Sequence, residues 1–198
     1  MDRARTSVVE AGRYVHGRGL THGRTGNVSA RVGDQVVVTP TGASLSTVTE
    51  SELAVIGLDG TVREGKPSKE TGLHLAVYRS RPTARAVVHT HSLYSAAVSC
   101  IPTVDEDDAL PPLTAYYRMR VGRLPVVPFA PPGDRQLAVH AGRAARDAHC
   151  MLLRNHGAVV AGDDLDHALD VLEELEHVAQ LYLLLGERAA PPADRHDG

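Results

Sequence analysis

Val87-Val88-His89-Thr90-His91 is the stretch on which the predicted fold is centred. Valine favours strands, and side chains along a strand alternate between its two faces. His89 and His91 are therefore expected on the same face, where a buried strand ends. A second apolar run, residues 151–153, leads to His156 in a turn beside a glycine. Three imidazoles with one open coordination position are a ligand set typical of catalytic zinc.

An acid is expected close to these histidines. In Pro67-Ser68-Lys69-Glu70, Ser68 is a typical helix N-cap, and Glu70 falls in the first turn of a helix expected to run to about residue 79. A histidine pair by itself is more often structural than metal-binding, and an acid in a first helical turn can simply complement the helix dipole. The combination of three histidines and one acid favours a catalytic metal centre.

Composition predicts one compact domain. The chain has 198 residues, of which 42% are hydrophobic, and a formal net charge of −3, which argues against a nucleic-acid partner. No apolar run is long enough to span a membrane, and residues 1–6 lack a signal core. Cys100 and Cys150 are interpreted as small buried apolar side chains. We expect a cytoplasmic protein with a single domain over residues 1–188 and a disordered tail over residues 189–198.

The hydrophobic pattern predicts an alternation of helices and strands. Helices are expected over residues 2–16, 68–79, 135–148 and about 164–185, with a short helix capped by Ser92. Strands are expected near residues 27–31, 35–39, 53–58, 61–64, 86–91, 124–129, 151–153 and 158–161, while residues 102–120 are interpreted as a loop. Because Pro125 and Pro128 interrupt the strand over residues 124–129, that strand is expected at the edge of the sheet.

Two short polar turns at strand ends offer an anion site. Gly26-Asn27 precedes one strand and Thr41-Gly42 follows the next, so that their backbone N–H groups and small side chains could hold an anion. The free N–H groups at the start of the helix after Ser68 would suit a phosphate. Ordinary turns and a well-capped helix explain the same residues. The residues alone leave both interpretations open.

Together these motifs resemble the class II aldolase/adducin family, from about residue 5 to residue 186. The matching stretches, in the family's order and approximate spacing, are Gly26-Asn27-Val28-Ser29, Thr41-Gly42, Pro67-Ser68-Lys69-Glu70, His89-Thr90-His91 and Asn155-His156-Gly157. The resemblance implies an α/β protein with a three-layer α/β/α fold and a largely antiparallel central sheet. It also implies a homotetramer with active sites at subunit boundaries, and Tyr116 or Tyr117 is the candidate for a tyrosine contributed by the neighbouring subunit.

The resemblance also implies a role for each site residue. Zn²⁺ or another divalent metal would be held by His89, His91 and His156, with Glu70 as the catalytic acid/base. The substrate phosphate would be bound by residues on three loops, namely Asn27, Thr41, Gly42, Ser68 and Lys69.

Within the family, the chain is most similar to the 3-oxo-tetronate 4-phosphate decarboxylases. Lys69 stands where sugar-phosphate aldolases usually carry serine, and the stretch over residues 109–125 also resembles the decarboxylases. The implied reaction converts a phosphorylated sugar acid to dihydroxyacetone phosphate and carbon dioxide through an enediolate that the metal stabilises. The alternatives are a fuculose 1-phosphate-like aldolase or a ribulose-phosphate 4-epimerase. A non-catalytic adducin-like interaction module fits less well, because the acid and all three histidines are present.

Overall fold

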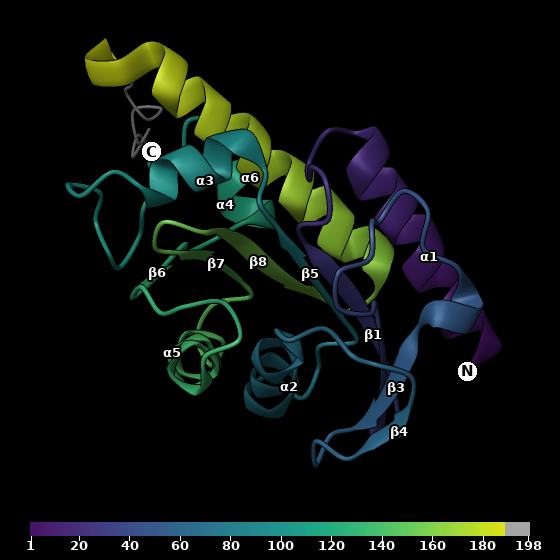
Figure 1. The fold of residues 1–198 in the computed structure, drawn as a ribbon. Helices are drawn as coiled ribbons and strands as arrows, with labels where there is room; N and C mark the ends of the chain where they lie inside the picture. The colour runs from purple at the N-terminus through teal and green to yellow at the C-terminus, as the bar shows by residue number, and fades with distance from the viewer. Residues whose placement is uncertain (189–198) are drawn as a thin grey trace, which may run out of the picture.

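The computed structural model describes residues 1–188 as a three-layer α/β/α fold (Figure 1). Its helices are α1 (Asp2–Gly17), α2 (Thr71–Ser80), α3 (Leu93–Ser99), α4 (Tyr117–Arg120), α5 (Arg135–Ala144) and α6 (Leu165–Leu185), with 3₁₀ turns η1 (Glu50–Glu52) and η2 (Gly186–Arg188). Its strands are β1 (Asn27–Val32), β2 (Gln35–Val38), β3 (Ala54–Gly57), β4 (Val62–Glu64), β5 (Ala86–Thr90), β6 (Val126–Val127), β7 (Cys150–Leu153) and β8 (Gly157–Gly162).

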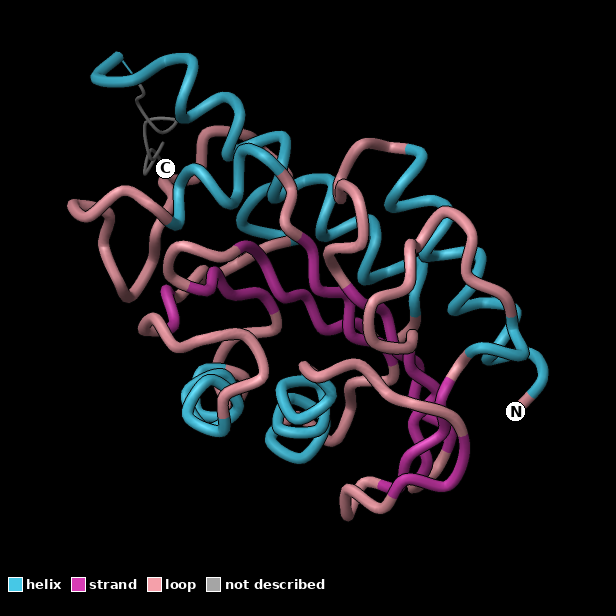
Figure 2. Tube along the Cα trace, viewed as in Figure 1, coloured by secondary structure: helices cyan, strands magenta, loops and turns pink. Residues whose placement is uncertain are grey.

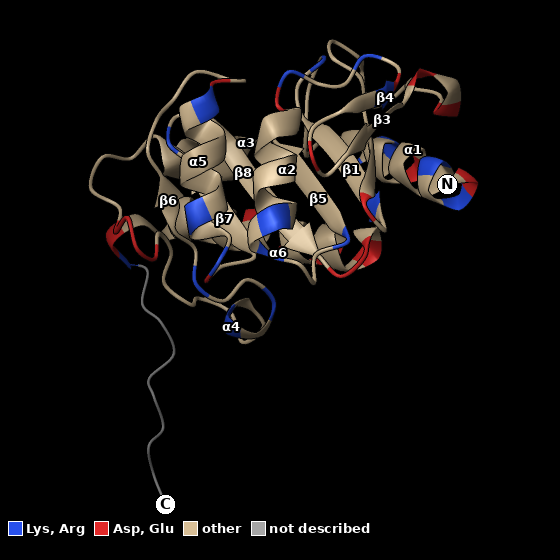
Figure 3. Cartoon of the chain, turned by 90° about the horizontal axis from the view of Figure 1, so that it is seen from below, with Lys and Arg blue, Asp and Glu red and all other residues tan. Residues whose placement is uncertain are grey.

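All eight strands form one sheet in the order β4-β3-β2-β1-β5-β8-β7-β6 (Figure 2). Neighbouring strands pair antiparallel, except that β6 runs parallel to β7 at the edge. Helices α1, α3, α4 and α6 cover one face, and α2 and α5 lie side by side on the other (Figures 1 and 3). The predicted three-layer fold with a largely antiparallel sheet is confirmed.

The central strand β5 shows why two helical layers are needed. Each of its five residues is buried, so both faces of the strand must be covered. Val88 packs into the core beneath α1 and α6, whereas Val87 packs into the core beneath α2 and α5. By the same alternation His89 points toward the α2 layer. The strand pattern therefore directs the histidine toward the helix that follows Glu70.

Several predicted elements need correction. The helix expected from residue 68 begins at Thr71, with Glu70 at its N-cap, because Ser68 instead forms a preceding turn in which its hydroxyl accepts from the Glu70 N–H. The helix over residues 135–148 ends at Ala144, and the edge strand is only two residues long. The loop over residues 102–120 contains the short helix α4. The disordered tail predicted for residues 189–198 lies outside the described residues.

The two cysteines differ from the prediction in one respect. Cys150 is fully buried in β7, as expected, but Cys100 is exposed at the C-cap of α3. Neither forms a disulfide. Within residues 1–188, no helix combines the length and the apolar character that a bilayer crossing requires.

Candidate metal centre

Four side chains converge at one end of the central strands. The Nε2 atom of His91 lies 3.1 Å from the Nε2 atoms of both His89 and His156. The Glu70 carboxylate approaches the Nε2 atoms of His89 and His156 at 3.5 and 3.4 Å. One potential ligand atom from each residue lies within 4.8 Å of the others. The structure thus brings together the three predicted metal ligands and the predicted acid.

The imidazole of His89 is oriented by a backbone partner. Its Nδ1–H donates to the carbonyl oxygen of Ala158 over 2.8 Å, which leaves the Nε2 lone pair facing the cluster. Burial, and then the neighbouring His156, lowers the pKa of His89 to about 3, although the bond to Ala158 acts in the opposite direction. Burial likewise lowers the pKa of His91 to about 3, and His89 and His156 add to this effect. Neutral imidazoles of this kind are the form that binds a metal.

Glu70 provides the test of whether a metal fits. Its Oε2 atom accepts a hydrogen bond from Asn27 Nδ2 at 2.9 Å, but Oε1 is buried and has no hydrogen-bond partner among the described residues. A buried, unpaired carboxylate oxygen is costly. It faces imidazole nitrogens whose lone pairs point at the same space, so a cation there satisfies the oxygen and all three rings. The donor set therefore fits a divalent metal.

A tight turn delivers His156 to this cluster. Asn155 has a φ of 55°, a left-handed conformation that asparagine tolerates better than most residues. Gly157 then starts β8 so close to β5 that a Cβ there would lie 2.1 Å from the carbonyl oxygen of Thr90. Asn155 and Gly157 therefore suit the geometry of the turn that positions His156 in the cluster.

His74 on α2 is a site residue that sequence reasoning missed. It is fully buried and lies between Asn27 and Ser29, where its Nε2 contacts Asn27 Oδ1 and its Nδ1 contacts Ser29 Oγ at 2.7 Å, both at hydrogen-bond distance. Burial, and then the nearby His89, lowers its pKa to about 3, while Glu70 acts in the opposite direction. The available signal was its spacing of four residues from Glu70, which places both on one face of a helix.

The predicted phosphate-binding residues lie on neighbouring loops. The N–H of Ser68 donates to the carbonyl oxygen of Thr39 at 3.3 Å, which joins the loop before α2 to the end of β2. Thr41 and Gly42 line a hollow of about 430 Å³ that carries two cations, Arg24 and Lys66, and one acid. The two cations were not predicted. Their side chains give this loop region a positive charge.

Lys69 immediately precedes Glu70 in the chain. Its side chain is exposed. Burial lowers the pKa of His156, Glu70 acts in the opposite direction, and the charge of Lys69 lowers it further.

The two candidate tyrosines occupy different environments. Tyr117 is fully buried within its own subunit, and its hydroxyl has no hydrogen-bond partner among the described residues. Tyr116 is 59% exposed and stacks beneath the guanidinium of Arg120. Of the two, Tyr116 has the exposure that a contribution to a neighbouring subunit requires.

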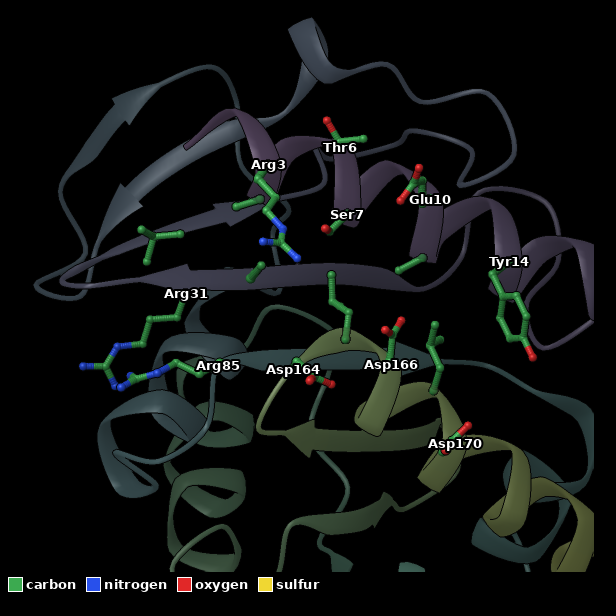
Figure 4. Close-up of a pocket in the computed structure, with 16 residues that line it drawn as sticks. Arg3, Thr6, Ser7, Glu10, Tyr14, Arg31, Arg85, Asp164, Asp166 and Asp170 are labelled. Atoms are coloured by element: carbon green, nitrogen blue, oxygen red, sulfur yellow. The ribbon is translucent and has the colours of Figure 1, made fainter.

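A larger hollow of about 860 Å³ lies elsewhere, between α1 and the start of α6 (Figure 4). It is lined by arginines from α1, β1 and the segment before β5, and by acids from α1 and α6, including Arg3, Arg31, Arg85, Glu10, Asp166 and Asp170. None of the four cluster residues lines it. The candidate site is therefore defined by the convergence of ligands and not by the size of a cavity.

The fold and the cluster define an α/β/α protein in which three histidines and one glutamate form a cluster that could hold a metal ion. Residues 6–183 match the family model described as the class II aldolase and adducin N-terminal domain. The chain belongs to the class II aldolase and adducin family.

Named relatives support the same assignment. A 3-oxo-tetronate 4-phosphate decarboxylase of Haemophilus influenzae is 43% identical over 180 residues, which cover 90% of this chain and 86% of the relative. The L-fuculose phosphate aldolase of Escherichia coli is 38% identical over 167 residues, covering 83% and 75%. The crystal structure of YgbL from Klebsiella pneumoniae superposes with a TM-score of 0.91 at 40% identity, covering 94% of this chain and 91% of that protein. Decarboxylases and aldolases of this kind are carbon–carbon lyases.

Proposed function

We propose that this chain is a metal-dependent carboxy-lyase that converts a 3-oxo-tetronate 4-phosphate to dihydroxyacetone phosphate and carbon dioxide. The observation that carries the proposal is the convergence of Glu70 with three histidines, in a chain 43% identical to a relative of that name. A 3-oxo acid loses carbon dioxide when the electron pair of the broken bond passes into the neighbouring ketone. The former carboxyl-bearing carbon then takes up one proton, which balances the reaction.

The site residues divide this work between them. His89, His91 and His156 would hold a divalent metal, with Zn²⁺ as the first choice for a set rich in imidazole. When bound, the metal acts as a Lewis acid toward the substrate ketone oxygen. Glu70 lies beside His89 and His156, and Oε1, the carboxylate oxygen that Asn27 does not hold, is the atom we assign to proton transfer. Because the site is buried, the carboxylate acts with little competition from water.

The phosphate end of the substrate would be bound by the loop region around Thr41, Gly42 and Ser68, with Lys69 nearby and Asn27 at its inner edge. Exposed backbone and hydroxyl groups at Thr41 and Gly42, beside the charges of Arg24 and Lys66, support this assignment. Lys69 supplies a further positive charge on the side of His156. A substrate with both a phosphate and a carboxylate suits such a site.

Three predictions concern the protein as a whole. A homotetramer, in which Tyr116 extends into the site of a neighbour, is supported by the exposure of that ring. A single domain over residues 1–188 is supported by the continuous eight-stranded sheet. A cytoplasmic location stays a prediction from the sequence.

An aldolase is the second candidate, because the Escherichia coli L-fuculose phosphate aldolase is 38% identical over most of this chain. Product analysis separates the two reactions. Zinc-loaded protein would be given 3-oxo-tetronate 4-phosphate and, separately, fuculose 1-phosphate, while dihydroxyacetone phosphate and carbon dioxide are measured together. We expect equal release of both products from the first substrate. Dihydroxyacetone phosphate from the second substrate alone would establish the aldolase instead.

Matched variants test the assigned residues. Glu70→Gln is expected to retain the metal and to lose at least about 100-fold in kcat, and near-normal turnover would remove Glu70 from its role. His91→Ala is expected to lose metal and activity together. His177→Ala, which changes an exposed histidine on α6, is the control and should lose neither. Full activity of His91→Ala without bound metal would contradict the metal assignment.

A further inference from the structure

A ladder of buried polar side chains connects β1 to α2 behind the metal centre. Asn27 Nδ2 contacts Glu70 Oε2 at 2.9 Å, and Asn27 Oδ1 contacts His74 Nε2. His74 Nδ1 contacts Ser29 Oγ at 2.7 Å, and Ser29 Oγ contacts the hydroxyl of Tyr78 at 2.8 Å. All five residues are at most 5% exposed. A fully buried polar network of this kind must be satisfied throughout, so each contact constrains the next.

The ladder follows from two sequence periods that coincide. Glu70, His74 and Tyr78 recur every four residues and share one face of the helix and its N-cap. Asn27 and Ser29 are two residues apart and share the α2 face of β1, opposite His89 and Val87. Four helical residues advance about 6 Å and two strand residues advance about 6.7 Å. The spacing of the helix residues therefore matches the spacing of the strand residues over the length of the ladder.

The direction of every hydrogen bond in the ladder is determined. A carboxylate only accepts, so the Asn27 atom facing Glu70 is the amide nitrogen and the atom facing His74 is the oxygen. His74 must then donate from Nε2 and accept at Nδ1, which requires the Ser29 hydroxyl to donate. Because the Ser29 hydroxyl proton is then used, the single O–H proton of Tyr78 donates to Ser29, either to Oγ at 2.8 Å or to the carbonyl oxygen at 3.1 Å. All donors point along the ladder toward Glu70.

We propose that His74 is a positioning residue for the reaction: its Nε2–H locks the carboxamide of Asn27, and Asn27 holds one oxygen of Glu70 so that the other faces the metal ligands. This inference rests on the proposed function, because it concerns the group assigned to proton transfer. It also explains why Oε1, and not Oε2, is the unpaired oxygen. Without the Nε2–H, the Asn27 carboxamide is free to turn over and present its oxygen to the carboxylate.

The first test reads the tautomer of His74 directly. Protein labelled with ¹⁵N-histidine would be examined by long-range ¹H–¹⁵N NMR, and His74 would be assigned by the signals that disappear in His74→Gln. We expect protonated Nε2 and unprotonated Nδ1, unchanged between about pH 6 and 8, a range in which free histidine titrates. An Nδ1–H tautomer, or a doubly protonated ring, would overturn the inference.

The second test separates positioning from folding. His74→Leu keeps the volume but removes the donor, and we expect kcat to fall at least about 10-fold with KM within about 3-fold and metal content unchanged. His74→Gln can place an amide N–H near the Nε2 position and should recover most of the lost kcat. Leu75→Ala, which creates a cavity on the neighbouring position of α2, is the control for lost stability and should retain kcat.

The outcomes are distinct from those of the proposed function. Wild-type kcat in His74→Leu, or an equal loss in Leu75→Ala, would show that His74 is only structural. Equal losses in His74→Gln and His74→Leu would show that the donor is not what matters. If the wild-type protein releases no carbon dioxide while the expected tautomer is present, the proposed reaction is wrong and the hydrogen-bond ladder stands.

Discussion

The buried carboxylate of Glu176 on α6 is expected to be one of the larger single contributions to stability. It is 9% exposed and accepts hydrogen bonds from the backbone N–H groups of Tyr94 and Ser95, at 2.8 and 2.9 Å, and from the Ser95 hydroxyl. These are the free donors at the start of α3, whose own N-cap residue, Ser92, makes no side-chain cap. Glu176 thus caps a helix that is distant in sequence.

The magnitude for Glu176→Gln follows from these three bonds. The amide keeps one oxygen but presents N–H groups where the second oxygen stood, so about one hydrogen bond to a charged acceptor is lost, worth roughly 2 kcal/mol. The remaining bonds become neutral and weaken by about 1 kcal/mol in total. We therefore expect the free energy of unfolding to fall by about 3 kcal/mol. Because α3 begins two residues after His91, bound metal should be lost at lower urea concentrations as well.

Urea unfolding at one fixed protein concentration measures this change. Glu173→Gln is the matched control, because the same substitution on the same helix removes only a surface contact with Arg18 and Tyr14. Surface ion pairs contribute little, so its urea midpoint should stay close to that of the wild type. Equal midpoints for Glu176→Gln and Glu173→Gln would refute the reasoning and show that water caps α3 equally well.

Three further predictions concern packing, pH and thiol chemistry. Gly157→Ala places a Cβ 2.1 Å from a backbone oxygen of β5 and should lower stability by at least about 2 kcal/mol in urea unfolding, whereas Gly17→Ala, with open space around it, should not. Because the folded pKa of His74 is lowered from 6.5 to about 3, its contribution to the free energy of unfolding is complete above about pH 6.5 and is lost as the pH falls toward 3, at up to about 1.4 kcal/mol per pH unit. The difference in urea midpoint between the wild type and His74→Leu at several pH values separates this contribution from those of His89 and His91, whose pKa values are also lowered to about 3. A thiol reagent should modify exposed Cys100 in the native protein and buried Cys150 only after unfolding, and two reactive thiols in the native protein would contradict this.

The periodicity of apolar residues predicted most of the fold, because this periodicity depends only on which faces of an element are buried. The continuous apolar run before His89 reflects a strand that is buried on both faces, and the helical pattern of α6 reflects one buried face. Ligand chemistry at the ends of predicted elements, together with the family resemblance, placed three histidines and Glu70 in one site. The cluster geometry bears out their proximity.

Contacts between side chains that are distant along the chain could not be predicted from the sequence. Ser68 has the local signature of an N-cap, but the helix begins after Glu70. The carboxylate of Glu70 is held by Asn27, which lies on the distant strand β1. His74 sits on an apolar helix face and is easily interpreted as core, and its partners are 45 and 47 residues away. Glu176 caps backbone groups 81 and 82 residues away. Such contacts depend on the strand order, which local patterns do not contain.

The register of β1 against β5 links the metal ligands to the residues behind them. Asn27 stands opposite His89, and Ser29 opposite Val87. A slip of one residue would turn both polar side chains of β1 to the opposite face, away from His74 and Glu70. Gly26 restricts such a slip, because its φ is 78° and a Cβ there would lie 2.9 Å from the carbonyl oxygen of His89. The position of Glu70 therefore depends on Gly26, and on Asn27 in β1, as well as on the helix α2 that it precedes.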